Sequence, residues 1–510
     1  MSRTKRFLGG LSLGYTNQAL LTLAGLWLTP FLLHRIGQQD YGLWLVATQL
    51  LSWLMLADLG VVALLPRETA YSTGRAGGYE KARDLPEIVG QTIRLTLLQV
   101  PLVALAAVVL WFLIPAEWTA LRWPLGLVMA VFVLLFPCRI FTAVLQGLQD
   151  LSFLALTQMS IWLLSTALTI AMVFAGFKLY ALVFGWLVTQ LLAPIVLWLR
   201  LLLRFPKALP SRLTRLHWPS ARTYLVKGFW INIAQIAQTI LNGIDILIIG
   251  KVLGPAMVVP YACTGKLINV MANQPQMLMQ AAFPALSEMR TAESKERLFR
   301  VCTALSQAML VISGCVVCVV LAVNKGFVSW WVGPEQYWGY RLTMALLLTM
   351  MLRHWSTTSV YALLCFGYER RVSVTHLIDG LVTLTTSAIL IWLLGPIGGP
   401  LGSMIGVCSI SLPRNLSALA RELNTSRAAL IAPLWPWFWR FAGFSLMLVL
   451  IARVWTPGTF ITIALTSTVV ASAYVTIMAP MSLNSPLGIY IRPRLASLRL
   501  RLLGAPGLSN

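Results

Sequence analysis

The stretch Gly14–Trp44, GYTNQALLTLAGLWLTPFLLHRIGQQDYGLW, has a counterpart in the second half of the chain. That counterpart is Gly228–Ala262, GFWINIAQIAQTILNGIDILIIGKVLGPAMVVPYA. Each stretch opens with glycine and an aromatic residue and carries asparagine and glutamine in its first turns. Each then runs apolar to a basic residue, a glycine and a tyrosine. Many secondary transporters consist of two such repeated lobes, with a substrate site where the lobes meet. The similarity therefore predicts two related helical lobes.

The composition indicates a membrane protein. The 510 residues are 58% hydrophobic and 11% charged, whereas soluble proteins have about a quarter charged residues. Apolar runs of about 20 residues, the length that crosses a bilayer, recur from end to end. We therefore expect an all-α polytopic membrane protein with about fourteen transmembrane helices. Their ranges are 8–33, 41–65, 89–114, 123–146, 152–176, 179–203, 223–250, 256–285, 298–323, 340–366, 371–394, 398–420, 434–454 and 459–482.

The runs group into lobes. We expect a six-helix N-terminal lobe at 1–203 and a basic cytoplasmic linker at 204–222. A six-helix C-terminal lobe at 223–420, a helix pair at 421–482 and a basic cytoplasmic tail at 483–510 would follow, around a central cavity. No cleavable signal peptide is evident, because the first apolar run is long and leads into a second. We expect this first span to stay in the protein.

The net charge of +23 does not indicate nucleic-acid binding. Most of the 39 lysine and arginine residues lie in the N-terminal arm, in loops on one side and in the C-terminal tail. This asymmetry predicts that both termini are cytoplasmic and that anionic inner-leaflet lipid surrounds the basic loops. The seven cysteines are scattered and there is no Walker-type phosphate loop. We predict no metal site, no catalytic residues and no ATP hydrolysis.

Four motifs resemble one family. They are LLHRIGQQDYGLW (32–44), LADLGVVALLPRETA (56–70), LQGLQDLSF (145–153) and DILIIGKVLGPAMVVPYACTGKL (245–267). In order and spacing they are similar to the polysaccharide-transporter branch of the multidrug/oligosaccharidyl-lipid/polysaccharide exporter superfamily, over about residues 1–420. The resemblance implies a V-shaped pair of helical lobes around a central cavity. It also implies that the protein transfers polyprenyl-pyrophosphate-linked sugars between leaflets by alternating access.

A polar stripe runs along the eighth predicted span. Within KLINVMANQPQMLMQ, the polar residues recur at i, i+3, i+7, i+10 and i+14, which is one face of a helix. They are Lys266, Asn269, Asn273, Gln276 and Gln280. Lys266 lies about ten residues into the span, roughly 15 Å deep. Either the stripe lines a wet cavity, which we favour, or its carboxamides hold helices together.

Further polar positions lie within other spans. The seventh span repeats the stripe, with Asn232, Gln235, Thr239, Asn242 and Asp245. A shorter version in the first span includes Gln18. Arg139 and Arg353 are cations within apolar runs, where a charge costs about 2.5–3.5 kcal/mol, although Arg139 could reach the interface by snorkelling. We predict that these groups bind substrate, because an excess of cations suits an anionic pyrophosphate.

Three acids lie within predicted spans: Asp58, Asp245 and Asp379. A carboxylate in the membrane either pairs with a base or takes up a proton. Asp379 could pair with Arg353 or His354, and Asp58 could be a packing contact. All three are candidates for coupling transport to H⁺ or Na⁺, and we expect no other cofactor.

The predicted function is a flippase for a lipid-linked oligosaccharide, an O-antigen or exopolysaccharide repeat unit, in the bacterial inner membrane. Expected partners are the lipid-linked cargo, anionic lipid, a polysaccharide polymerase and other assembly proteins. Three alternatives stay open: a flippase for the lipid-linked peptidoglycan precursor, a cation-coupled drug exporter, and an integral-membrane glycosyltransferase or polymerase.

Overall fold

The computed structural model describes residues 20, 22–210, 217–292, 294–484, 486–490 and 492. Side chains of residue 220 and of several residues in 280–292 lie outside the description. The described residues form helices and connecting turns, with no strand among them. This confirms the all-α class. The chain divides into two compact units, Met1–Val259 (unit 1) and Pro260–Asn510 (unit 2).

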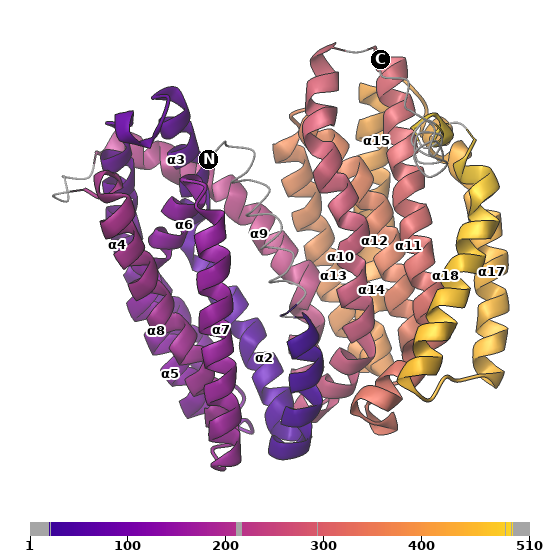
Figure 1. Cartoon of the computed structure of the whole chain (residues 1–510), viewed down its shortest axis with the longest axis horizontal. Helices are drawn as coiled ribbons and strands as arrows, with labels where there is room; N and C mark the ends of the chain where they lie inside the picture. The colour runs from indigo at the N-terminus through magenta and orange to yellow at the C-terminus, as the bar shows by residue number, and fades with distance from the viewer. Residues whose placement is uncertain are drawn as a thin grey trace, which may run out of the picture. The chain divides into compact units, whose positions relative to one another are not determined.

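Unit 1 consists of helices that run side by side (Figure 1). A helix over 22–36 precedes the labelled elements. These are α2 (Gln38–Leu54), α3 (Val61–Arg75), α4 (Leu85–Leu113), α5 (Thr119–Leu135), α6 (Arg139–Gly147), α7 (Leu151–Phe174), α8 (Leu179–Arg204) and α9 (Trp218–Val252). Short 3₁₀ segments, η1 (Met55–Asp58) and η3 (Phe136–Cys138), follow α2 and α5.

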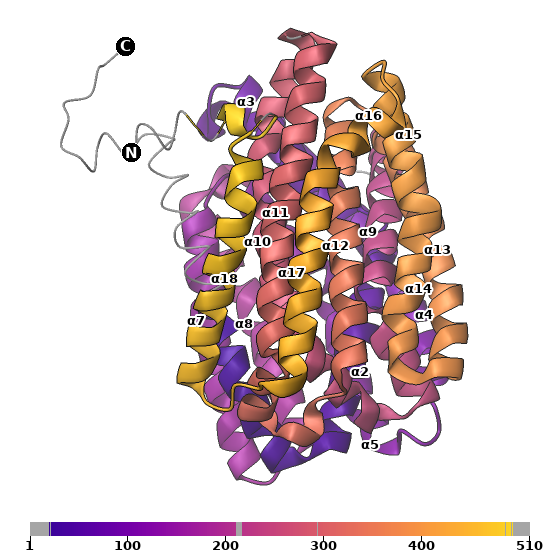
Figure 2. The same cartoon turned by 90° about the vertical axis from the view of Figure 1, so that its right-hand side faces the viewer.

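Unit 2 is built around α11. It contains most of α10 (Pro255–Ala292), then α11 (Lys295–Val332), α12 (Tyr340–Cys365), α13 (Glu369–Leu394), α14 (Gly398–Gly406), the π-helical η7 (Val407–Ser411), α15 (Leu412–Glu422), α16 (Arg427–Ile431), α17 (Trp435–Val454) and α18 (Phe460–Ser482). Figure 2 shows α17 and α18 in front of α11, and both pack on it together with α12. The apolar core joins these four helices through residues such as Val320, Leu347, Phe444 and Tyr474.

Nine helical segments of the described chain are long and apolar enough to cross a membrane, or ten if the bent pair α2–α3 is one span. One of the nine, Glu369–Glu422, contains two of the predicted spans. Helices α10 and α12 are not among the nine, although they have 38 and 26 residues. Both contain the polar residues that the sequence singled out, and these lower their hydropathy. A multi-pass membrane protein is supported, while the count of about fourteen spans stays a prediction.

Three predicted spans are interrupted in the structure. The span 41–65 bends by 57° between α2 and α3, where Leu59 and Gly60 both have positive φ, 50° and 73°. The span 123–146 is divided by η3, which contains Pro137. The span 398–420 contains the five-residue π-helix η7. Irregular helix geometry at membrane depth often occurs at functional sites.

The two units separate after Val259, not within the basic linker at 204–222. The reason is that α9 packs on α2 and α3. Gly228 of α9 lies so close to the α2–α3 turn that a Cβ on Gly60 would be 2.2 Å from the Gly228 carbonyl oxygen. The predicted lobe boundaries concern a sequence repeat, which compactness does not test, so they stay a prediction.

Candidate functional site

Among the described residues, two arginine–aspartate ion pairs have an almost fully buried carboxylate, one in each unit. In unit 2, Arg353 Nη1 lies 3.2 Å from Asp379 Oδ2, and in unit 1, Arg139 Nη1 lies 3.4 Å from Asp58 Oδ2. The two carboxylates are 0% and 2% exposed. Each pair lies beside one of the helix interruptions described above. The two pairs are therefore the first candidates for groups that do more than pack.

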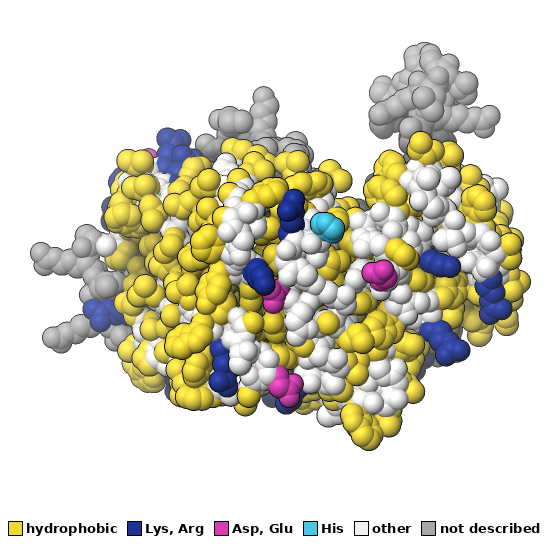
Figure 3. Space-filling model, turned by 90° about the horizontal axis from the view of Figure 1, so that it is seen from below, with side chains coloured by type: hydrophobic (Ala, Val, Ile, Leu, Met, Phe, Trp, Pro, Cys, Tyr) yellow, Lys and Arg dark blue, Asp and Glu magenta, His cyan; other side chains and the backbone are white. Residues whose placement is uncertain are grey.

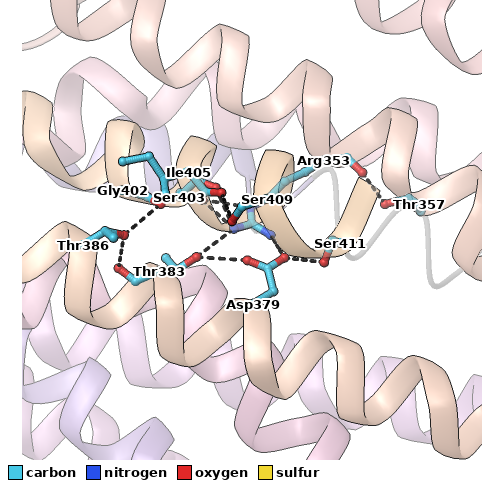
Figure 4. A network of polar contacts seen from close by, with 10 residues as sticks. All are labelled: Arg353, Thr357, Asp379, Thr383, Thr386, Gly402, Ser403, Ile405, Ser409 and Ser411. Atoms are coloured by element: carbon cyan, nitrogen blue, oxygen red, sulfur yellow. Dashed lines mark hydrogen bonds and ion pairs between the residues drawn. The ribbon is translucent and has the colours of Figure 1, made fainter. Parts of the chain in front are cut away.

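The pair in unit 2 joins three helical segments (Figure 4). Arg353 extends from α12 between α13 and the α14–η7 segment, and its side chain is 22% exposed. Its Nε donates to Ser403 Oγ at 2.9 Å and its Nη2 donates to the same oxygen at 2.7 Å. Nη2 also lies 3.4 Å from Thr383 Oγ1. The guanidinium is thus held by one carboxylate and two hydroxyl groups.

Asp379 is surrounded by donors. Thr383 Oγ1 donates to its Oδ1 at 3.1 Å, and Ser411 in η7 donates to its Oδ2. Gly406 lies against the same group, since a Cβ there would be 2.4 Å from Asp379 Oδ1 and 2.3 Å from Thr383 Oγ1. Only a residue without a side chain lets the backbone approach this closely. The π-helix thus brings Ser411 onto a carboxylate that Arg353 and Thr383 also contact.

The pair in unit 1 lies at the α2–α3 interruption. Asp58 is the last residue of η1, and its Oδ1 accepts a hydrogen bond of 2.7 Å from the Gly60 backbone N–H. Gln99 Nε2 donates to the Asp58 carbonyl oxygen at 3.0 Å. Arg139 reaches the carboxylate from the first residue of α6, and its guanidinium also lies 5.5 Å from the Phe136 ring. Asp58 therefore accepts a hydrogen bond from the backbone and forms an ion pair with Arg139.

The sequence left two partners open for Asp379, and the structure selects Arg353. His354 points elsewhere because neighbouring helical residues are about 100° apart. It is 1% exposed, and its Nδ1 makes a 2.8 Å hydrogen bond with Ser313 of α11. The third predicted acid, Asp245, is partly buried on α9.

The stripe on α10 is partly exposed. Asn269 and Asn273 are exposed, while Lys266 and Gln276 are partly buried. The Gln280 side chain lies outside the described residues. Among the described residues, no hydrogen bond joins Asn269 or Asn273 to another helix. The lining role and the helix-association alternative both stay predictions.

The related stripe on α9 is mixed. Asn232 is 5% exposed and its Oδ1 has no hydrogen-bond partner among the described residues. Gln235 is partly buried and Asn242 is exposed. Gln18 lies outside the described residues. No cluster of three or more His, Cys, Asp or Glu side chains that could hold a metal ion occurs in the described part of the chain.

Sequence reasoning missed the hydroxyl groups around Arg353. Ser403, Ser411 and Thr383 look like ordinary small residues of apolar helices. A signal was present in the glycine-rich run GGPLGSMIG, 398–406, which allows close approach of neighbouring helices. Gln99 was missed because one carboxamide in an apolar run is common.

Two solved structures define the fold class. The lipid II flippase MurJ, in an inward closed conformation, matches with a TM-score of 0.58 at 11% identity, covering 88% of this chain and 99% of that one. A MOP superfamily transporter from Pyrococcus furiosus matches with a TM-score of 0.51 at 12% identity, covering 82% and 95%. The chain has the helical fold that these transporters share, MOP being the multidrug/oligosaccharidyl-lipid/polysaccharide exporter superfamily.

One protein-family model also matches the chain. The family described as polysaccharide biosynthesis protein matches residues 102–334. None of the curated proteins matches the chain. The family match and the fold both agree with the resemblance of the sequence motifs to the polysaccharide-transporter branch of the MOP superfamily.

Proposed function

We propose that the protein is a flippase that moves a polyprenyl-pyrophosphate-linked oligosaccharide from the inner to the outer leaflet of a bacterial inner membrane by alternating access. The cargo would be an O-antigen or exopolysaccharide repeat unit. The match to a polysaccharide biosynthesis family supports a sugar-containing cargo. The fold, which the lipid II flippase MurJ shares, supports transport across the membrane.

The observation that carries the proposal is the partly exposed stripe on α10. A lysine and two carboxamides on one face of a transmembrane helix cost free energy unless they face water or a polar ligand. Lys266 would bind a phosphate oxygen, because an ammonium is a compact point charge with three donors. Asn269, Asn273, Gln276 and Gln280 would bond to sugar hydroxyls. The α9 carboxamides Asn232, Gln235 and Asn242 are further candidates for substrate binding.

The two ion pairs would couple transport to an ion gradient. Protonation of Asp379 would remove its charge and release the Arg353 guanidinium, which could then attract a phosphate. The same argument applies to Asp58 and Arg139 in unit 1, and Asp245 is a third candidate. H⁺ and Na⁺ are the ions to test.

The orientation follows from the distribution of charge. Figure 3 shows the structure from below, where a few basic and acidic side chains lie scattered among hydrophobic ones. We propose that this end faces outward and that both termini are cytoplasmic. Partners would then include anionic inner-leaflet lipid, a polysaccharide polymerase and other assembly proteins.

The test is a flipping assay with the full chain in proteoliposomes. A fluorescent polyprenyl-pyrophosphate oligosaccharide in the membrane becomes accessible to an impermeant glycosidase when it crosses. Lys266→Arg should keep much of the rate, Lys266→Ala should abolish it, and Lys266→Glu should be at least as severe because it repels phosphate. Lys325→Ala, an exposed lysine of α11, is the matched control and should flip normally.

Two results would refute the proposal. One is a wild-type protein that leaves the oligosaccharide inaccessible, and the other is a Lys266→Ala variant that flips at the wild-type rate. A deletion strain identifies the cargo, because the substrate of the missing flippase accumulates. The fold likeness to a lipid II flippase makes the peptidoglycan precursor the second candidate, and its accumulation would favour that reading.

A further inference from the structure

A pocket opens at the end of unit 2 where α12 ends and α13 begins. Its volume is about 400 Å³. It is lined by Gly367, Tyr368, Arg370, Arg371, Val374 and Arg414. Two of the three arginines come from the first turn of α13 and the third comes from the first turn of α15. A helix end, an aromatic ring and three guanidinium groups thus surround one small volume.

Every charged side chain that lines the pocket is a cation. Arg371 Nε is buried and has no hydrogen-bond partner among the described residues. Neither Arg371 nor Arg414 forms an ion pair within the described part of the chain. The carboxylate of Glu422 is engaged by the Tyr368 hydroxyl, which donates to it at 2.7 Å. The guanidinium groups of Arg371 and Arg414 repel one another, and a bound anion reduces this cost.

The geometry points to a phosphate-binding site in this pocket, outside the two ion pairs and the polar stripes. Arginine binds phosphate with paired N–H donors, and the first turn of α13 adds its positive dipole end. The ligand is a phosphate group carried either by an anionic phospholipid headgroup or by a free phosphate. A headgroup would place its phosphate between Arg371 and Arg414. The volume falls within the range of about 300–1,000 Å³ typical of small-molecule sites.

The inference does not depend on the cargo of the flippase. The sugar-binding stripe and the ion pairs could fail their tests while this pocket still binds phosphate. In the proposed orientation the pocket lies at the cytoplasmic end of the helices, where the phosphates of the inner leaflet are. A lipid bound there would bridge α13, which packs on η7, and α15, which follows η7 in the chain.

Native mass spectrometry of the full chain in detergent tests the site. The probes are short-chain phosphatidylglycerol and, separately, inorganic pyrophosphate. Arg371→Gln and Arg414→Gln should each weaken binding at least about tenfold, since each removes a charge-assisted contact. Arg427→Gln removes the same charge from an exposed arginine outside the pocket and should bind like the wild type.

The two probes separate the sources of the phosphate. Binding of phosphatidylglycerol that depends on Arg371 and resists millimolar pyrophosphate assigns a lipid headgroup. Binding of pyrophosphate that depends on Arg371 assigns a free phosphate. The inference is wrong if neither probe binds to the wild type. It is also wrong if each probe binds equally well to the wild type, to Arg371→Gln and to Arg414→Gln. Should Arg371→Gln fail to fold, Arg371→Lys replaces it and should bind measurably more weakly than the wild type, because lysine lacks the paired donors.

Discussion

Replacing Asp379 by alanine should destabilise unit 2 strongly. The side chain is fully buried and accepts from Arg353, Thr383 and Ser411. Alanine removes all three interactions and leaves a guanidinium within the helices without its counter-charge. Removing one partner of a buried ion pair typically costs about 3–5 kcal/mol. Since Arg353 is 22% exposed and keeps Ser403 as a partner, the lower value of about 3 kcal/mol applies.

This loss of unfolding free energy corresponds to a decrease in the melting temperature Tm. For a domain of 150–250 residues, 1 kcal/mol shifts Tm by roughly 2–4 °C, so Asp379→Ala should lower Tm by about 6–12 °C. The measurement is thermal unfolding of the purified full chain in detergent, followed by size-exclusion chromatography of the remaining folded protein. Glu80→Ala is the control, because its pair with Lys207 spans 3.8 Å and is 80% and 66% exposed. Such a surface pair contributes about 0–1 kcal/mol.

A double variant separates the ion pair from general packing. Arg353→Met combined with Asp379→Leu removes both charges and retains similar volume, so it should recover most of the lost stability. The reasoning is refuted if Asp379→Ala melts within about 2 °C of the wild type, roughly the shift of 1 kcal/mol. It is also refuted if the double variant is no more stable than the single one.

Four further outcomes are expected. Gly406→Ala should lower stability by about 1–3 kcal/mol through overpacking, whereas Gly443→Ala, with nothing within 4 Å of its Cβ, should not; unfolding measures both. Asp58→Asn should make flipping independent of the ion gradient if this carboxylate carries the ion, and unchanged gradient dependence in proteoliposomes would reject that role. A cysteine at Asn269 should react with a water-soluble thiol reagent, and a lack of labelling in every state would mean that this face is dry. Reporter fusions after Gly176 and Glu335 should report the outer side, and a cytoplasmic signal at either would contradict the proposed topology.

Composition and periodicity were sufficient to predict the fold class. Runs of apolar residues predict helices wherever a bilayer excludes other structures, because every backbone group must find a partner inside its own segment. The same patterns placed Asp379 and Arg353 on neighbouring spans. Depth and charge then made an ion pair the natural expectation, and the structure chose between Arg353 and His354 by the rotation of α12 alone.

The helix interruptions could not be predicted in the same way. A window of apolar residues is equally compatible with a straight span and with one that contains a π-turn, since both bury the same side chains. The interruption at Leu59 and Gly60 depends on close contact with Gly228, which lies far away in sequence. The role of Ser411 depends likewise on η7, which turns its hydroxyl toward Asp379. Such features arise from tertiary contacts that one sequence does not display.

The interruptions and the buried acids explain each other. A break in a membrane helix frees backbone donors and acceptors, and each free group in an apolar environment costs several kcal/mol if it stays unpaired. The Asp58 carboxylate accepts from the freed Gly60 N–H, and Gln99 Nε2 donates to the Asp58 carbonyl oxygen. These two side chains therefore replace hydrogen bonds that the interrupted helix does not make. A carboxylate fixed in this way needs a cation, which Arg139 supplies from the next interruption. An asparagine at position 58 retains the acceptor for Gly60 and removes only the charge. That variant therefore separates the structural role of Asp58 from a role in ion coupling, which an alanine at the same position would confuse.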